Sequence, residues 1–315
     1  MIIYQIKNKP SNCISKVLPL NNKSFVVLSL KLPNTAKVEI IGINSSIYYD
    51  YYFENFSYNS AFNNILFKYK DGFGVFNCFN TFLFWGDIKK KPKIYKIKNP
   101  FQLDGNSKKY FTKIASFDDA SDSVFLGLEE KGPSWDYARY WTQLHFQKKK
   151  LFGINIPKTN LVWKNKNELP LQEYPQTWNH KKPNEEWLNI CDLMIKQNEI
   201  FIHTNGGKLT RVYSVPECEF SIISQLTLQN KLIRNFPIKE GNGFFTSSKD
   251  YFILQNRENK ELLTFYETEN FEIESEILLH PKRHLDGENS HYLKTDFFQG
   301  NLYLYNANFL NICMP

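Results

Sequence analysis

Histidine and carboxylate residues gather in one segment, residues 280–291, which reads HPKRHLDGENSH. These are residue types that ligate metal ions: His280, His284, His291, Asp286 and Glu288. Two histidines four residues apart share one face of an α-helix and form a recognised ligand pair there. Pro281 and the dipeptide at 286–287 favour a loop instead, in which this spacing fixes no ligand geometry. We therefore expect a solvated polar loop and no metal site.

A second oxygen-rich segment, FDDASDS at 117–123, supplies Asp118, Asp119 and Asp122. Loops of this kind hold Ca²⁺ when the ligands follow the EF-hand order and end in a glutamate. That order and that glutamate are missing here. Aspartate and serine side chains also cap turns without any metal, and we expect a capped turn.

The signatures of catalysis and of phosphate binding are missing from the sequence. It has no G-x-S-x-G nucleophile elbow. Gly206–Gly207 and Gly241–Gly243 resemble hairpin turns, and neither is followed by the Lys-Ser/Thr pair of a phosphate-binding loop. The sequence therefore identifies no catalytic residue and no cofactor. It leaves enzymatic activity open but favours a non-enzymatic role.

The elements that would position any site are β-rich runs that recur along the chain. Six such runs begin at Phe25, Phe82, Thr142, Ile200, Tyr251 and Leu302, at intervals of 51 to 60 residues. A second run follows each of them after a short polar turn, as in FVVLSL followed by KVEIIGI. A strand repeat of this period is typical of the blades of a radial β-sheet ring.

The pattern resembles the β-propeller superfamily over nearly the whole chain, without matching one family of it. The glycine-histidine and tryptophan-aspartate blade ends of WD40 repeats are missing, as are the kelch double glycine and the sialidase box. The resemblance implies an all-β fold: a single propeller domain over residues 1–315, with about six four-stranded antiparallel blades. The expected blades are 1–43, 44–97, 98–156, 157–215, 216–268 and 269–315.

Some details of the strand order follow from the same runs. We expect LIRNFPI to open the fifth blade and Asn205–Gly207 to form a turn in the fourth. Ring closure is left with two alternatives. The segment Ile2–Ile6 either opens the first blade as its inner strand or completes the last blade as its outer strand.

Two consecutive connections are longer than the others, and loops of a repeat scaffold are common binding sites. One is the connection between the second and third strands of the third blade, from Glu129 to Trp141. The other leaves that blade and runs from Pro157 to about Asn189. In a four-stranded antiparallel blade both connections emerge at the same edge. We therefore expect the two insertions to lie side by side on one face of the disc.

These insertions hold five of the six tryptophans of the chain. Aromatic side chains and arginine dominate protein-binding hot spots, although buried tryptophans would also serve as the small cores of two ordered loops. The residues predicted to contact a partner are Trp135, Tyr137, Arg139, Trp141, Trp163, Tyr174, Trp178 and Trp187.

The composition limits the classes of partner and of environment. The chain carries 39 basic and 32 acidic residues, a formal charge of +7, with a dense lysine run over 89–98. Lysines also protect exposed sheet edges from association, and no nucleic-acid-binding motif accompanies them, so a nucleic-acid partner is not expected. Five separated cysteines without a C-x-x-C pair are typical of reduced thiols. No export signal or membrane-spanning segment is recognisable, and we expect a cytoplasmic protein.

Two functions fit these features. The first is a non-enzymatic scaffold that binds another protein through the tryptophan-rich loops, for example an immunity protein that neutralises a toxin. The alternative is a carbohydrate-binding or hydrolytic propeller that uses the same aromatic face, with Asp136, Glu185 and Glu186 as acidic candidates. The first buries on the order of 800 Å² per partner. The second would fill a pocket of roughly 300–1,000 Å³.

Overall fold

The structure is a computed structural model that covers the 315-residue chain. It describes these parts of the chain: residues 1–7, 12–31, 35–44, 46–53, 65–76, 80–86, 92–98, 110–130, 138–151, 154–162, 172–173, 186–208, 220–288 and 293–314.

Strands dominate the described residues, and those of the first half form three antiparallel sheets, which we call blades 1 to 3. Blade 1 holds β2 (Asn12–Asn21), β3 (Ser24–Lys31), β4 (Thr35–Gly42) and β5 (Ile47–Phe53). Blade 2 holds β6 (Ile65–Tyr69), β7 (Gly72–Phe76), β8 (Asn80–Trp85) and β9 (Lys93–Lys98). Blade 3 holds β10 (Tyr110–Asp118), β11 (Ser123–Glu130), β12 (Ala138–Leu151) and β13 (Ile154–Val162), with the short β14 (Gln172–Glu173) paired to β12.

The second half forms blades 4 to 6. Blade 4 holds β15 (Glu186–Lys196), β16 (Glu199–Lys208), β17 (Phe220–Thr227) and β18 (Leu232–Ile238). Blade 5 holds β19 (Gly241–Phe245), β20 (Tyr251–Asn256), β21 (Leu262–Glu267) and β22 (Ile273–Leu278). Blade 6 holds β23 (Lys294–Phe298), β24 (Asn301–Tyr305), β25 (Phe309–Cys313) and β1 (Ile2–Lys7). A π-helical turn, η1 (Pro281–Leu285), links blades 5 and 6.

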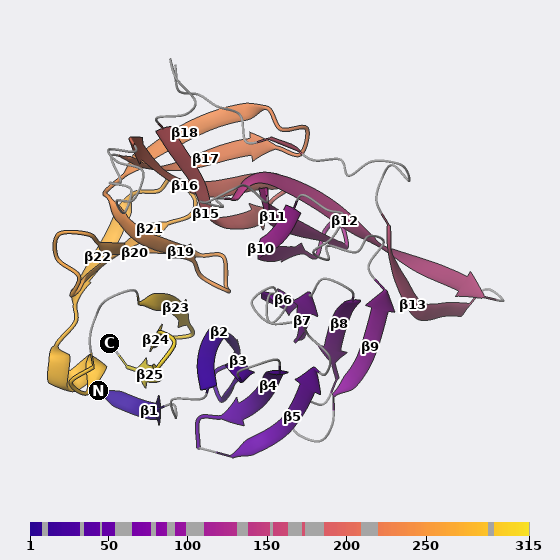
Figure 1. The fold of residues 1–315 in the computed structure, drawn as a ribbon, viewed down its shortest axis with the longest axis horizontal. Coiled ribbons are helices and arrows are strands. Elements are labelled where there is room, and N and C mark those ends of the chain that lie inside the picture. The colour runs from indigo at the N-terminus through magenta and orange to yellow at the C-terminus, as the bar shows by residue number, and fades with distance from the viewer. Residues whose placement is uncertain are drawn as a thin grey trace.

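The six blades stand around a common centre, as Figure 1 shows. Each blade contributes its first strand to the inside of the ring, and each inner strand contacts the inner strands of both neighbouring blades: β2, β6, β10, β15, β19 and β23. The chain is therefore a six-bladed β-propeller, which confirms the fold class expected from the sequence.

The ring is closed by the N-terminal strand. β1 pairs antiparallel with β25 and so becomes the outer strand of blade 6 (Figure 1). The Met1 amino group donates to the Met314 carbonyl over 3.0 Å, which joins the two ends of the chain. Of the two alternatives left open by the sequence, the structure has the outer strand of the last blade.

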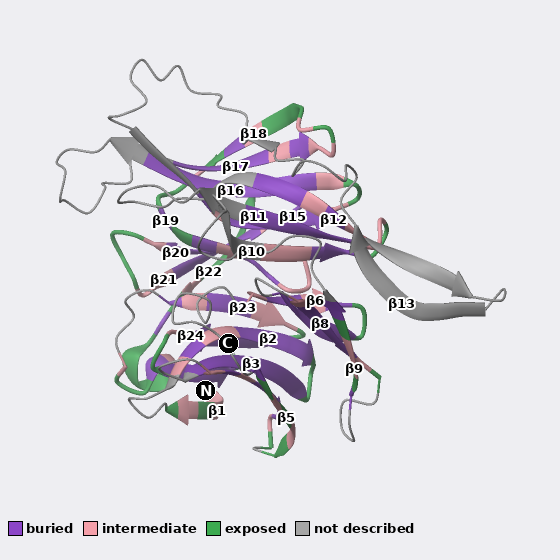
Figure 2. Ribbon diagram, turned by 45° about the vertical axis from the view of Figure 1, so that its right-hand side comes forward, coloured by how far each residue is buried: buried purple, intermediate pink, exposed green. Residues whose placement is uncertain are grey.

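Burial falls from the middle of each blade to its rim. All five residues of β24 and of β25 are buried, whereas five of the six residues of β22 are exposed. Figure 2 shows the same gradient, with middle strands such as β3 and β17 mostly purple and green in the outer strand β18. The second and third strands of a blade are covered by neighbouring blades on both faces, so they read as nearly continuous apolar runs.

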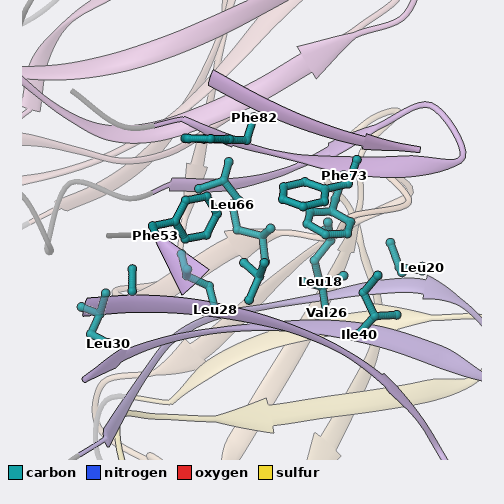
Figure 3. Packing of buried hydrophobic residues seen from close by; sticks show 14 residues of the cluster. Leu18, Leu20, Val26, Leu28, Leu30, Ile40, Phe53, Leu66, Phe73 and Phe82 are labelled. Carbon is teal, nitrogen blue, oxygen red and sulfur yellow. The ribbon is translucent and has the colours of Figure 1, made fainter. Parts of the chain in front are cut away.

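The hydrophobic core is divided among the blade interfaces. Among the described residues, one buried cluster lies at each of the six interfaces. Figure 3 shows the cluster between blades 1 and 2, where Leu18 and Leu28 face Leu66. In the same cluster the rings of Phe53 and Phe82 meet edge to face at 4.9 Å. Phenylalanine supplies much of this area, and each large apolar side chain contributes about 1.5–3 kcal/mol when fully buried.

One glycine in blade 2 is required by close packing. Gly74 in β7 lies opposite Phe67 in β6, and a Cβ at this position would meet the tip of the Phe67 ring. We expect Gly74→Ala to lower the free energy of unfolding by about 1–3 kcal/mol, the usual cost of overpacking a core. Urea denaturation of Gly74→Ala alone and combined with Phe67→Leu checks this. The alanine should cost clearly less in the leucine background, and equal costs in both backgrounds would contradict the packing argument.

The structure corrects the expected assignment of segments to strands and blades in three places. The segment LIRNFPI is β18, the outer strand of blade 4, and does not open blade 5. Asn205–Gly207 lies within β16, paired with β15, and is not a turn. The first expected blade, 1–43, is also displaced, because β1 belongs to blade 6 and blade 1 extends to Phe53.

None of the helices among the described residues has the length and the apolar character that a membrane span requires.

Candidate functional site

The two long connections of blade 3 meet at β12. Residues Tyr140 and Trp141 of β12 pair with Glu173 and Gln172 of β14, which comes from the connection that leaves the blade. The described strands also shorten both insertions. β11 ends at Glu130 and β12 begins at Ala138, so the first connection is 131–137. The second lies between Val162 and Glu186 and contains β14. The pairing places β14, from the second connection, beside the start of β12, into which the first connection leads.

One predicted contact residue lies in the core. Trp141 is 2% exposed, and its indole N–H donates to Asn230 Oδ1 of blade 4 over 3.0 Å. Its ring packs near Phe125 in the cluster between blades 3 and 4. This indole therefore stabilises a blade interface and is not available to a partner in this structure.

The remaining predicted contact residues fall where the structure gives no side-chain description. Arg139 is in β12 and Trp187 is in β15, and only their backbones are described. The others lie outside the described residues: Trp135, Tyr137, Trp163, Tyr174 and Trp178.

The histidine-rich segment contacts β1, the outer strand of blade 6. Pro281–Leu285 is a π-helical turn where a loop was expected, and His284 Nδ1 accepts the His280 backbone N–H over 2.8 Å. Asp286 pairs with Lys7 of β1 at 2.9 Å. These polar groups are thus engaged within the protein. Among the described residues, no three histidine, cysteine or carboxylate side chains lie together as a metal site.

The FDDASDS segment is a capped turn, as expected, because Asp118 Oδ2 accepts the Ser121 backbone N–H over 2.9 Å. Next to it lies a serine–histidine contact that the sequence analysis missed. Ser123 Oγ is 2.7 Å from His145 Nδ1 and also donates to the Ser121 carbonyl over 2.9 Å. Ser123 is fully buried in the strand. A substrate cannot reach this hydroxyl, so the pair has a structural role.

A polar cavity lies at the centre of the ring, toward the ends of the inner strands where the first-to-second-strand turns lie. All six inner strands line it, and the cavity volume is about 70 Å³. Its charged lining residues are Lys16, Lys68, Lys249, Asp192 and Asp296. The connections 131–137 and 163–185 leave from the opposite strand ends, so the cavity and the insertions belong to opposite faces of the disc.

The two aspartates of the cavity hold blade 5 between its neighbours. Asp192 of blade 4 accepts the Phe245 backbone N–H over 2.8 Å, at the end of β19. Asp296 of blade 6 accepts the Ser247 backbone N–H over 2.9 Å, two residues further along. Asp192 follows a register shift in β15, and such bulges redirect a side chain. The carboxylates therefore connect three blades at the channel wall.

Burial shapes the protonation of these groups. Loss of solvent raises the pKa of Asp192, and it raises the pKa of Asp296 to about 6 in spite of the Ser247 hydrogen bonds. Lys16, in contrast, is held in its charged form. Burial opposes its charge, but the electrostatic attraction of Tyr305, Asp192 and Asp296 raises its pKa in total. Lys16 is thus the counter-charge of the two aspartates.

The sequence carries a signal for these residues that the sequence analysis did not use. Asp192 and Lys68 are charged side chains inside apolar runs of inner strands, ICDLMI and ILFKY. A lone charge in a strand covered on both faces must reach a polar cavity or a partner, because an isolated buried charge is costly.

Comparison with known proteins gives similarity of fold only. No family model matches the chain, and the search of curated proteins finds no match. Among solved structures, the Pan2 WD40 domain of Neurospora crassa is 8% identical, with a TM-score of 0.49 over 100% of this chain and 95% of that one. A protein of unknown function from Bacteroides caccae is 9% identical, with a TM-score of 0.44 over 90% and 83%. BamB from Moraxella catarrhalis is 8% identical, with a TM-score of 0.39 over 93% and 82%. The assignment of the fold rests on the sheet topology itself.

Proposed function

We propose that this propeller is a scaffold that binds another protein through the two connections of blade 3, residues 131–137 and 163–185. The observation that carries the proposal is the pairing of β14, from the second connection, with the start of β12, into which the first connection leads. A propeller fold is compatible with many functions, so the proposal depends on this local feature.

The composition of the two connections supports the same role. They hold three of the six tryptophans of the chain, Trp135, Trp163 and Trp178, and Trp187 follows two residues after the second connection ends. Tryptophan and tyrosine are enriched in binding hot spots, because they provide a large apolar area and a hydrogen-bond donor. Tyr137, Arg139 and Tyr174 complete the proposed contact set, and Trp141 is left out because it is buried.

The proposal is tested by affinity capture from the native lysate with the wild-type chain, the double variant Trp135→Ala/Trp178→Ala and the control Trp85→Ala. Trp85 is the one tryptophan far from the insertions in the sequence, and it stacks on Tyr95 of β9 at 4.0 Å. We expect one stoichiometric protein with the wild type and with the control, and its loss with the double variant.

Three outcomes have a defined meaning in this experiment. Loss of the partner from a double variant with an unchanged melting temperature supports the proposal, and the identity of the captured protein decides whether a toxin is the partner. A fall in stability of several kcal/mol, on the scale of about 3–5 for a buried tryptophan, would contradict it, because the side chains would then be core. An empty capture with folded wild-type protein would also contradict it and would favour a small ligand on this face.

A further inference from the structure

Two lysines at the central cavity have no carboxylate partner among the residues that the structure describes. Lys249, in the turn after β19 of blade 5, donates to the Phe117 carbonyl of blade 3 over 2.9 Å. Lys68 of β6 donates to the Leu20 carbonyl of blade 1 over 3.3 Å. No carboxylate among the described residues lies within 4.0 Å of either Nζ atom. Each ammonium group therefore has a neutral backbone oxygen as its described partner.

The cost of this arrangement is electrostatic. Burial lowers the pKa of both Lys68 and Lys249, and the charges of aspartates offset this only in part. These aspartates are Asp71 and Asp119 for Lys68, and Asp118 and Asp119 for Lys249. A desolvated ammonium group needs a counter-charge, which a carbonyl dipole does not provide.

The two carboxylates of the cavity do not provide that counter-charge. Asp192 and Asp296 accept hydrogen bonds from backbone N–H groups of blade 5, and their charges raise the pKa of Lys16. Lys294, beside them, donates to the Ser15 carbonyl over 2.9 Å and does not line the cavity. The cavity lining thus carries three lysines against two aspartates, and the unmatched positive charge lies at Lys68 and Lys249.

We propose that the central cavity binds a small ligand through one anionic group, a carboxylate or a phosphate-like oxyanion, placed between Lys68 and Lys249. Ser116 and Thr246 add hydroxyl groups to the lining, and Phe67, Met194 and Phe245 border its apolar part. A cavity volume of about 70 Å³ limits the ligand to a small molecule. This site lies on the face opposite the insertions and does not depend on the protein-binding role.

Isothermal titration calorimetry with sulfate and with acetate tests the site, because both probes keep a constant charge between pH 7 and 10. We compare the wild type with Lys68→Gln/Lys249→Gln and with the matched control Lys231→Gln/Lys239→Gln. The control removes the same charge from two exposed lysines of blade 4 and its junction with blade 5. We expect saturable binding of at least one probe at one site per chain, an affinity loss of tenfold or more in the cavity variant, and no such loss in the control.

Two results would overturn the proposal. One is the absence of saturable binding of both probes to folded wild-type protein. The other is an equal loss of affinity in the cavity variant and in the surface control, which indicates a general charge effect. The comparison of sulfate with acetate shows which kind of anionic group the site prefers.

A second readout needs no variant and applies even if the cavity variant does not fold. The sulfate affinity of the wild type should fall as the pH rises from 7 to 10, since the two lysines with lowered pKa values lose their protons in this direction. The neighbouring groups are Asp71, Asp118, Asp119, Asp192, Asp296, Lys16 and Lys294. An affinity that is constant or rises over this range contradicts a site built on these lysines.

Discussion

Deletion of residues 1–7 should lower the free energy of unfolding by about 5 kcal/mol, because β1 closes the ring. Its half-buried side chains Ile3, Tyr4 and Ile6 pack on the cluster between blades 6 and 1. Tyr4 meets Phe25 of blade 1 edge to face at 5.1 Å, so the strand holds the last blade against the first. Each of these side chains contributes part of the roughly 1.5–3 kcal/mol of full burial. The deletion also exposes the edge of β25.

A loss of this size matters because domains are stable by only about 5–15 kcal/mol. Urea denaturation of the deleted and full-length chains measures it. A synthetic peptide of residues 1–7, added to the deleted chain, should restore most of the lost stability, and a peptide with the same residues in scrambled order should not. A deleted chain with the stability of the full chain would contradict closure by β1.

The second large effect concerns His203, a fully buried side chain at the interface of blades 4 and 5. Its Nδ1 lies 3.1 Å from the Gly243 carbonyl of β19, and its Nε2 lies 2.9 Å from Ser221 Oγ. Burial lowers the pKa of His203 from 6.5 to about 4. The folded chain therefore keeps this imidazole neutral at a pH where the unfolded chain has protonated it.

The sign of the pH dependence follows from proton linkage. Below pH 6.5 His203 binds a proton in the unfolded chain but stays neutral in the folded chain. His203 therefore lowers the free energy of unfolding as the pH falls toward 4. At about 1.36 kcal/mol per pKa unit, its contribution is about 3 kcal/mol. Asp296 acts in the opposite direction. With its pKa raised from 3.8 to about 6, it binds a proton first in the folded chain and adds stability as the pH falls over the same window.

These opposing contributions give two variants with opposite behaviour. Relative to the wild type, His203→Gln should gain about 3 kcal/mol of unfolding free energy between pH 6.5 and 4, because the histidine penalty is removed. Asp296→Asn, which keeps the Oδ1 acceptor, should lose a similar amount between pH 6 and 4. Urea denaturation at half-unit pH steps measures both differences. Parallel pH profiles of wild type and His203→Gln would show that the buried imidazole is not the group responsible.

The sequence predicts the fold class because the strands of a propeller are strongly apolar. It does not predict which position each strand takes within its blade. The six runs used to find the repeat are second strands in blades 1, 4, 5 and 6, as with FVVLSL in β3. In blades 2 and 3 they are third strands, as with FLFW in β8. Second and third strands are both covered on two faces and look alike in sequence. This is why LIRNFPI was assigned to the wrong blade.

The candidate sites divide in the same way. The neighbourhood of the two insertions could be predicted from strand polarity, and in the described residues the pairing of β14 with β12 bears on the second insertion alone. The burial of Trp141 could not, because it depends on Asn230, which is 89 residues away in the chain. The central cavity was missed because its charges come from all parts of the chain, from Lys16 to Asp296, and meet only when the ring closes.

Hydrogen–deuterium exchange of the purified chain, with and without the protein that it captures, shows whether the partner binds at blade 3. We predict protection of residues 131–137 and 163–185, which include β14, and unchanged exchange in the turn that carries Lys249 on the opposite face. Protection confined to that opposite face, or no protection of the two connections, would contradict a scaffold that binds its partner through blade 3.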